Sequence, residues 1–366
     1  MTRDRATSTR RSSGTLLIAA ALLIAIAAGF TATMRASDNL DFAINGQIVD
    51  IVWDSRLFDG TPGFPGAILW NHNPSGMPSN FTQASFESAI ETSFNTWESV
   101  DNGIPEEPLV PVVNFGGQST ATDAFALDGV NLVSWKPDFP GGMLAVTPCW
   151  GLDAPTTTTT DAQGRTVLPV DNGTIPFPGP PGVTYPVGTV IDCGMQFDNI
   201  DPWSTTDDPD PNRFDVQGVA THEGGHFIGV SHSTLGDFTA SNAMSATMLP
   251  VVAEGDANPR TLEEDDKAAI LRLYARNRFS GPIAQTVAGR ALITLRLLKD
   301  GACVPATGVS VVAYRTQGGI NGPNRIETFS GSQLRAFTPN QPFNGSATLN
   351  LPLLPPGESY TLRENL

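Results

Sequence analysis

Three of the four histidines in this 366-residue chain, His222, His226 and His232, fall within eleven residues. On a helix, His222 and His226 are four positions apart and share one face, with Cβ atoms about 5–6 Å apart. Two imidazoles at that spacing can bind one metal ion. Gly229 then ends the helix and lets His232 reach the same ion, which leaves a fourth tetrahedral position for water. The spacing therefore predicts a zinc centre with three histidine ligands.

Glu223 follows the first of these histidines and cannot join the face that His222 and His226 share. A carboxylate in that place is free to act on a zinc-bound water molecule. The metal lowers the pKa of that water to about 7. We expect Glu223 to be a general base that accepts the water proton and returns it to a leaving amine. Gly224 and Gly225 each cost about 1 kcal/mol relative to alanine inside a helix. A merely structural helix would not need that cost, and a chance match to so long a string is improbable.

The histidine string needs a helix, and its flanks predict one over residues 216–229. Asp215 is a good N-cap, and Phe214 and Val219 are spaced to form a hydrophobic staple around it. A further helix is expected over residues 261–274, opened by a capping box of Thr261 and Glu264.

Residues 82–100 have the apolar periodicity of a helix that packs on a sheet. Its stripe consists of Phe86, Ile90, Phe94 and Trp97. Alternating β-branched runs predict the strands of that sheet. They are expected at residues 42–53, 130–135, 143–147 and 189–198.

The string from His222 to His232 resembles the signature of the metzincin zinc endopeptidases, H-E-x-x-H-x-x-G-x-x-H followed by a Met-turn. Met244 and Met248 are the candidates for that turn, and ATMLP at residues 246–250 is similar to the turn of the matrixin branch, which selects Met248. Ser233, directly after the third histidine, is also similar to matrixins.

This resemblance covers about residues 42–276 and implies an α+β, zincin-like catalytic domain, with a twisted mixed sheet, an active-site helix and a closing helix. It implies a zinc-dependent endopeptidase whose substrates are proteins or peptides, with Met248 as an apolar floor. It also places residues 143–147 at the sheet edge above the cleft, where an extended peptide can pair by strand addition. The competing function is a non-catalytic surface or adhesion protein that keeps the zinc site, and the presence of Glu223 favours the enzyme.

The chain also departs from the matrixin pattern. Matrixins hold a second, structural zinc through further histidines, but only His72 remains here, and Gln196 stands where the family has one such ligand. A structural zinc is therefore not expected, and no cysteine-switch propeptide motif precedes the domain. The acidic residues Asp201, Asp207, Asp208 and Asp210 are either calcium ligands or a solvated acidic loop. The spacing of a known calcium loop is absent, which favours the solvated loop.

The N-terminal residues indicate export. Four arginines within residues 1–14 precede an uncharged apolar run at residues 16–30, the pattern of a signal peptide that we assign to residues 1–37. An uncleaved anchor is the alternative, but it needs about 20 apolar residues. Export permits disulfides, and Cys149 and Cys193 bracket a Thr/Pro/Gly-rich stretch expected to be one long surface loop. The sequence leaves open whether these two cysteines form a bridge.

Composition narrows the class of partner. The formal charge of −16 lacks the basic surface that nucleic acids or acidic membranes attract. After signal cleavage we expect a secreted or cell-surface protein that engages protein substrates, without a membrane span, and nothing indicates its oligomeric state.

Residues 281–366 lose helical periodicity and contain short alternating runs at 290–297, 308–314 and 347–351. Their turn and strand residues resemble carboxypeptidase-regulatory-like or Cna-B-type β-sandwiches, which implies an accessory domain for spacing or attachment. The chain stops within a predicted strand, so this domain is expected to be truncated. The predicted division is a signal peptide at 1–37, a catalytic domain at 38–280 and a small all-β sandwich at 281–366.

Overall fold

The computed structural model describes residues 41–44, 47–100, 110–137, 139, 142–206, 210–232 and 246–274, followed by the strands between residues 284 and 365. The predicted signal peptide, residues 1–37, lies outside these residues. In the part of the chain described, helices are too short or too polar for any of them to cross a bilayer.

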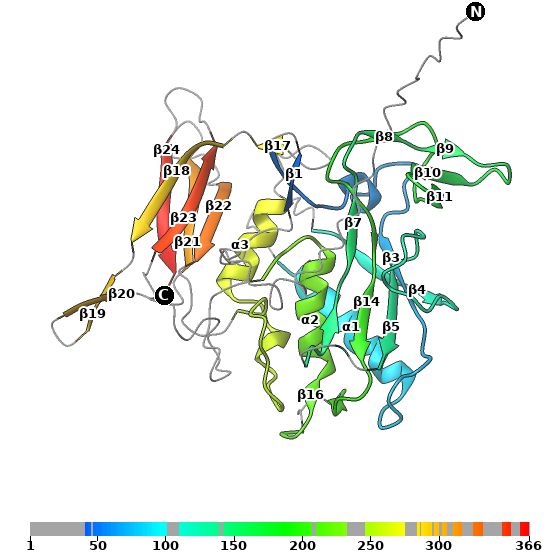
Figure 1. Cartoon of the computed structure of the whole chain (residues 1–366), viewed down its shortest axis with the longest axis horizontal. Helices are drawn as coiled ribbons and strands as arrows, with labels where there is room; N and C mark the ends of the chain where they lie inside the picture. The colour runs from blue at the N-terminus through cyan, green and yellow to red at the C-terminus, as the bar shows by residue number, and fades with distance from the viewer. Residues whose placement is uncertain are drawn as a thin grey trace, which may run out of the picture.

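A five-stranded mixed sheet forms the centre of the fold (Figure 1). In spatial order its strands are β4 (Val113–Gln118), β3 (Ile68–His72), β5 (Leu132–Lys136), β14 (Met195–Asp198) and β6 (Ala145–Val146). The first four run parallel, and β6 pairs antiparallel with β14. The expected strand at residues 143–147 is thus shorter in the structure, and it lies at an edge of this sheet.

Helix α1 (Gln83–Glu98) begins after the N-cap Thr82, whose side chain accepts a hydrogen bond from the backbone N–H of Ser85. The four residues of the predicted apolar stripe are all buried. Phe86 packs against Trp135 and Phe197 from the sheet, with ring centroids 4.8 and 5.4 Å away. The stripe therefore fixes α1 on the sheet, as its periodicity predicts, and α1 also packs against α2 (Val216–Phe227).

Two strand predictions were wrong because a single run forms two strands. Residues 42–53 contain the hairpin of β1 (Asp41–Ile44) and β2 (Gln47–Asp50). Residues 189–198 divide into β13 (Val190–Cys193) and β14 at Gly194, where a Cβ atom would overlap the backbone of Ala124. At this glycine the chain changes partners, since β13 pairs with β7 (Cys149–Gly151) whereas β14 pairs with β5 and β6.

The stretch between the two cysteines was predicted to be a long surface loop, but it is a folded β unit. Its strands are β7 (Cys149–Gly151), β8 (Thr156–Thr157), β9 (Thr159–Thr160), β10 (Thr166–Val170), β11 (Gly173–Pro176), β12 (Thr184–Tyr185) and β13. Its threonines and valines are β-branched and suit strands, and it buries Leu168, Ile175, Phe177 and Tyr185. Figure 1 shows this unit beside the N-terminal part of the domain.

Beyond residue 280 the described residues are strands, and some of them overlap the three runs expected there. They are β17 (Ala284–Gln285), β18 (Val287–Thr294), β19 (Arg296–Lys299), β20 (Ala302–Pro305), β21 (Ser310–Thr316), β22 (Arg325–Gly331), β23 (Ser346–Pro352) and β24 (Ser359–Asn365). Strand β21 lies between β22 and β24, β18 pairs with β23, and β19 pairs with β20. The sandwich packing of these strands stays a prediction.

Candidate active site

The histidine-bearing helix α2 begins at Val216, the residue that the sequence predicts. Its N-cap Asp215 is fully buried, and the Asp215 carboxylate accepts a hydrogen bond of 2.8 Å from the Gly218 N–H. The same carboxylate binds the guanidinium of Arg260 at 2.6 and 2.7 Å. This ion pair ties the start of α2 to the 3₁₀ turn η3 (Asn258–Arg260), which precedes the helix over residues 264–273.

Gly229 ends the helix in the way its position predicts. Its φ of 96° is in the left-handed region, and a Cβ atom there would overlap the carbonyl oxygen of Ile51. The Gly229 N–H donates to His226 O at 3.0 Å and the Val230 N–H donates to Gly225 O at 2.8 Å. These two bonds are those of a Schellman motif. The chain therefore turns back just before His232.

The structure brings the three predicted histidine ligands together. Their candidate ligand nitrogens all lie within 4.8 Å of one another, and the Nε2 atoms of His226 and His232 are 3.1 Å apart. His222 Nδ1 donates to Thr247 O and His226 Nδ1 donates to Val230 O, both at 2.8 Å. Because a carbonyl only accepts, these bonds place the proton on Nδ1 and leave Nε2 of both rings free to bind a metal.

This donor set fits a zinc ion. Tetrahedral Zn–N bonds of about 2.0–2.1 Å set the nitrogens roughly 3.3 Å apart, close to the His226–His232 distance. Desolvation lowers the pKa of His222 to about 4 and, together with the positive charge of His222, that of His226 to about 3. Burial also lowers the pKa of His232. At neutral pH all three rings are neutral, which is the form that binds metal.

Glu223 lies on α2 beside the histidines, with 5% of its surface exposed. Its Oε2 atom accepts a hydrogen bond of 2.6 Å from the hydroxyl of Thr147, which directly follows edge strand β6. Burial raises the pKa of Glu223 to about 7, so the carboxyl group is poised to exchange a proton near neutrality. Sequence reasoning did not identify Thr147, because a hydroxyl before a proline has no distinctive pattern.

Met248 lies under the histidine helix and is fully buried. A Cβ atom on Gly225 would overlap its sulfur and lie 2.7 Å from Trp97 Cζ2, whereas one on Gly224 would meet nothing closer than 3.5 Å. Packing against Met248 therefore explains the glycine at 225 but not the one at 224. Met244 and Ser233 lie outside the described residues.

The turn that carries Met248 is held by a buried carboxylate that sequence reasoning did not assign to the site. Asp266 accepts from the backbone N–H groups of Thr247 at 2.9 Å and Met248 at 3.1 Å. Its Oδ2 also accepts from the N–H of Glu263 at 2.9 Å. Asp266 thereby links the methionine turn to the first turn of α3 (Glu264–Leu273).

The predicted capping box of Thr261 and Glu264 was wrong. Helix α3 begins at Glu264, and its N-cap is Glu263. The Thr261 carbonyl instead accepts a hydrogen bond of 2.5 Å from the Thr247 hydroxyl. The helix thus starts at Glu264, three residues after the Thr261 carbonyl that contacts the methionine turn.

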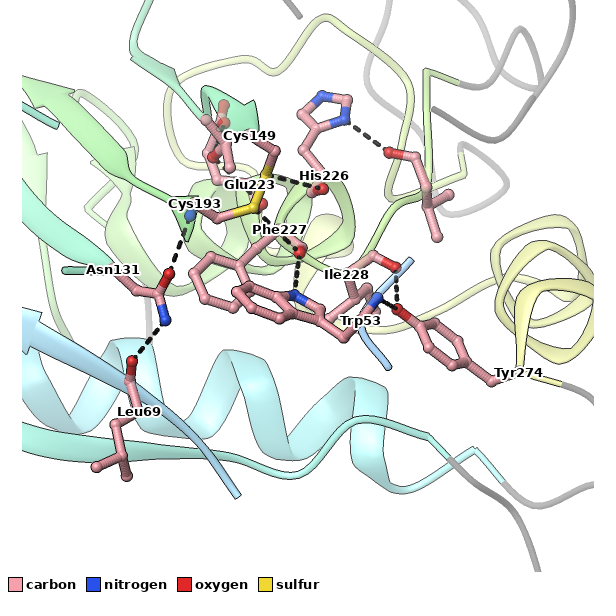
Figure 2. Close-up of a disulfide and its surroundings, with 12 residues drawn as sticks. Trp53, Leu69, Asn131, Cys149, Cys193, Glu223, His226, Phe227, Ile228 and Tyr274 are labelled. Atoms are coloured by element: carbon pink, nitrogen blue, oxygen red, sulfur yellow. Dashed lines mark hydrogen bonds between the residues drawn. A yellow bond between two sulfur atoms is a disulfide. The ribbon is translucent and has the colours of Figure 1, made fainter. Parts of the chain in front are cut away.

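The carbonyl end of α2 is held by residues that are distant in sequence (Figure 2). The indole N–H of Trp53 donates to Phe227 O, and the Tyr274 hydroxyl donates to Ile228 O, both at 2.8 Å. Cys149 and Cys193 form a disulfide, and their sulfurs lie 3.7 Å from His226 O and 3.6 Å from Phe227 O. Both cysteines are buried, so the bridge packs against the helix end as well as closing the β unit.

The residues considered for other metals have different surroundings. His72 is fully buried, and its Nδ1 hydrogen bonds with Glu87 of α1 at 2.8 Å. Gln196 donates to Ser134 at 3.2 Å. Asp210 binds the side chain of Arg213 at 3.2 Å, while Asp207 and Asp208 lie outside the described residues. Within the described ranges, the histidine trio is the group of three or more metal-binding side chains that could hold an ion.

Comparison with known proteins agrees with this geometry. Residues 171–275, which include α2 and α3, match the family described as Matrixin. A segment of 110 residues is 32% identical to Metalloendoproteinase 1 of Glycine max; it covers 28% of this chain and 32% of that protein. The chain thus matches about a third of the length of this relative. Together with the mixed sheet and few helices, these similarities support a matrixin-like metalloprotease domain.

Proposed function

We propose that the protein is a zinc-dependent endopeptidase with His222, His226 and His232 as metal ligands and Glu223 as general base. The observation that carries the proposal is the convergence of three imidazoles beside a buried carboxylate. A site that held zinc only for structure would not need such a carboxylate. The Matrixin match over this segment supports the same activity.

When bound, zinc lowers the pKa of a water molecule and polarises the carbonyl of a peptide bond. The protein residues position and exchange the proton. The backbone carbonyls of Thr247 and Val230 orient two imidazoles, and Met248 supports the helix from below. Glu223 accepts a proton from the attacking water at a carboxylate oxygen and then passes it to the nitrogen of the leaving amine.

We propose that the substrate is an extended protein or peptide segment that adds to the sheet at β6. This strand lies at the edge of the five-stranded sheet, and Thr147, directly after it, contacts Glu223. Strand addition would therefore place a peptide beside the general base. To test this, cleavage of a peptide library is mapped for the wild type and for Leu144→Pro and Ala145→Pro. An unchanged cleavage register and rate in both variants would contradict this binding mode.

The activity is tested by incubating purified protein with denatured proteins, with and without a chelator, and sequencing the new ends. Glu223→Gln should keep its zinc and lose hydrolysis by about 100-fold or more, as expected for loss of a general base. Hydrolysis by this variant at the wild-type rate would remove Glu223 from the mechanism. A wild type that binds zinc but cleaves nothing would favour the non-catalytic surface protein.

We also propose that the protein is exported. The basic and apolar leader of residues 1–37 and the disulfide between Cys149 and Cys193 support an oxidising compartment. Expression of the full chain in a host with a secretory pathway should yield a mature N-terminus near residue 37. Retention of residues 1–37 at the membrane would instead identify an anchor.

A further inference from the structure

Thr147 lies between the sheet edge and the proposed general base. The whole residue is 4% exposed, and its hydroxyl donates to Glu223 Oε2 at 2.6 Å. Among the described residues, this hydroxyl is the hydrogen-bond donor to that carboxylate. A bond to one oxygen fixes the rotation of the carboxylate plane, and the second oxygen stays available to a water molecule.

The backbone N–H and C=O groups of Thr147 point away from the neighbouring strand β14. The register pairs Ala145 with Phe197 and Val146 with Gln196, and the carbonyls of Leu144 and Pro148 accept from the N–H groups of β14 and Gly194. In an antiparallel pair, the backbone groups of successive residues point alternately toward the partner strand and away from it. Those of Thr147 therefore point away from β14, as those of Ala145 do, but Thr147 is almost fully covered whereas Ala145 is partly exposed. The accessible part of this sheet edge thus lies at Ala145, two residues before the residue that contacts Glu223.

We propose that Thr147 is a positioning residue for the general base. Its hydroxyl holds the Glu223 carboxylate in the orientation that accepts the water proton, and its place two residues after Ala145 ties that orientation to the sheet edge. This inference rests on the proposed endopeptidase function.

The hydroxyl is tested with Thr147→Val, which replaces it with a methyl group of similar size, and with Thr147→Ser as the matched control. Both variants keep the backbone of the sheet edge, so we expect KM to stay within about twofold of wild type. The kcat of Thr147→Val should fall about tenfold or more, as for loss of a hydrogen bond to a charged group, and Thr147→Ser should restore it. Zinc content should be unchanged in both.

A second measurement uses the metal-free protein. Thr147→Val should lower the midpoint of urea unfolding when Glu223 is present and have a smaller effect in a Glu223→Ala background. In that background the short bond to the carboxylate is already lost, and only the 3.3 Å contact of the hydroxyl with the backbone carbonyl of residue 223 remains. Equal shifts in the two backgrounds would overturn the coupling between the two side chains.

The kinetic outcomes separate this inference from the proposed function. If the wild type and Thr147→Val hydrolyse peptides with the same kcat, the positioning role is wrong and the endopeptidase stands. If Thr147→Val loses activity because it loses zinc, or if Thr147→Ser does not restore kcat, the role is also wrong. If the zinc-loaded wild type hydrolyses no peptide, the proposed function fails and the inference fails with it.

Discussion

The two adjacent glycines of α2 offer a sharp test of how the site is packed. A methyl group at Gly225 would overlap the Met248 sulfur and lie 2.7 Å from Trp97 Cζ2. Neither the Met248 nor the Trp97 side chain can move away to make space for this methyl group. The Trp97 indole N–H donates to Thr221 O at 2.7 Å, and Met248 is fully buried with its backbone N–H bonded to Asp266.

Gly225→Ala therefore combines a gain with a larger loss. Replacing a helical glycine with alanine stabilises the folded state by about 1 kcal/mol. Overpacking a tight core costs about 1–3 kcal/mol, and two simultaneous overlaps suggest the upper end of that range. We expect a net loss of roughly 2 kcal/mol in the free energy of unfolding, together with weaker zinc binding, because His226 is the next residue.

Gly224→Ala is the matched control, since its Cβ would lie 3.5 Å from Trp97 and 3.6 Å from Phe94, at ordinary contact distance. It should gain up to about 1 kcal/mol, so that the two variants differ by roughly 3 kcal/mol. Urea unfolding of the metal-free proteins measures this difference, and titration with a zinc indicator measures metal affinity. Equal stability of the two alanine variants would refute the view that Met248 and Trp97 require a glycine at 225.

Three further predictions concern charge. Burial raises the pKa of Asp192 to about 7 from an ordinary 3.8, so the folded state keeps a proton that the unfolded state loses, and stability falls as pH rises between these values. At pH 8 the free energy of unfolding of Asp192→Asn, measured with urea, should therefore exceed that of wild type by up to about 4 kcal/mol. This difference should vanish near pH 4. Burial lowers the pKa values of His222 and His226 in the metal-free protein to about 4 and 3, so zinc affinity should begin to weaken only below about pH 5, which titration with an indicator dye can follow. Affinity that already weakens near pH 6.5 would contradict this. Asp266→Asn should lower the free energy of unfolding by about 2 kcal/mol, and with it the thermal unfolding temperature, since an amide offers one acceptor oxygen where the carboxylate offers two. An unchanged unfolding temperature would show that the methionine turn does not depend on the Asp266 carboxylate.

The sequence predicted those parts of the site that are local along the chain. The start of α2 at Val216 follows from Asp215, and its end follows from Gly229, because caps and left-handed glycines act within a few residues. The spacing of the three histidines then placed them together without knowledge of the sheet. The stripe of α1 was equally predictable, since its period alone identifies the buried face.

The contacts that were missed join residues far apart in the sequence. Thr147 and Glu223 are 76 positions apart, and Trp53 and Phe227 are 174 apart. No periodicity or cap records such a pairing, because it is set by how the sheet and helices pack. The division of one apolar run at Gly194 has the same origin, since the nearby backbone of Ala124 decides it.

The candidate metal site is built from more of the chain than residues 171–275, which match the Matrixin family. The last carbonyls of a helix have no partner within it, and in α2 they meet Trp53, Tyr274 and the turn at Gly229. The Tyr274 hydroxyl also accepts from the Trp53 backbone N–H at 3.2 Å, which joins the two ends of the described domain at this point. Trp53 and Thr147 both lie outside the matched residues 171–275. A fragment restricted to that match would keep the three histidines and Tyr274 but lose Trp53, which binds the carbonyl end of α2, and Thr147, which contacts the proposed general base.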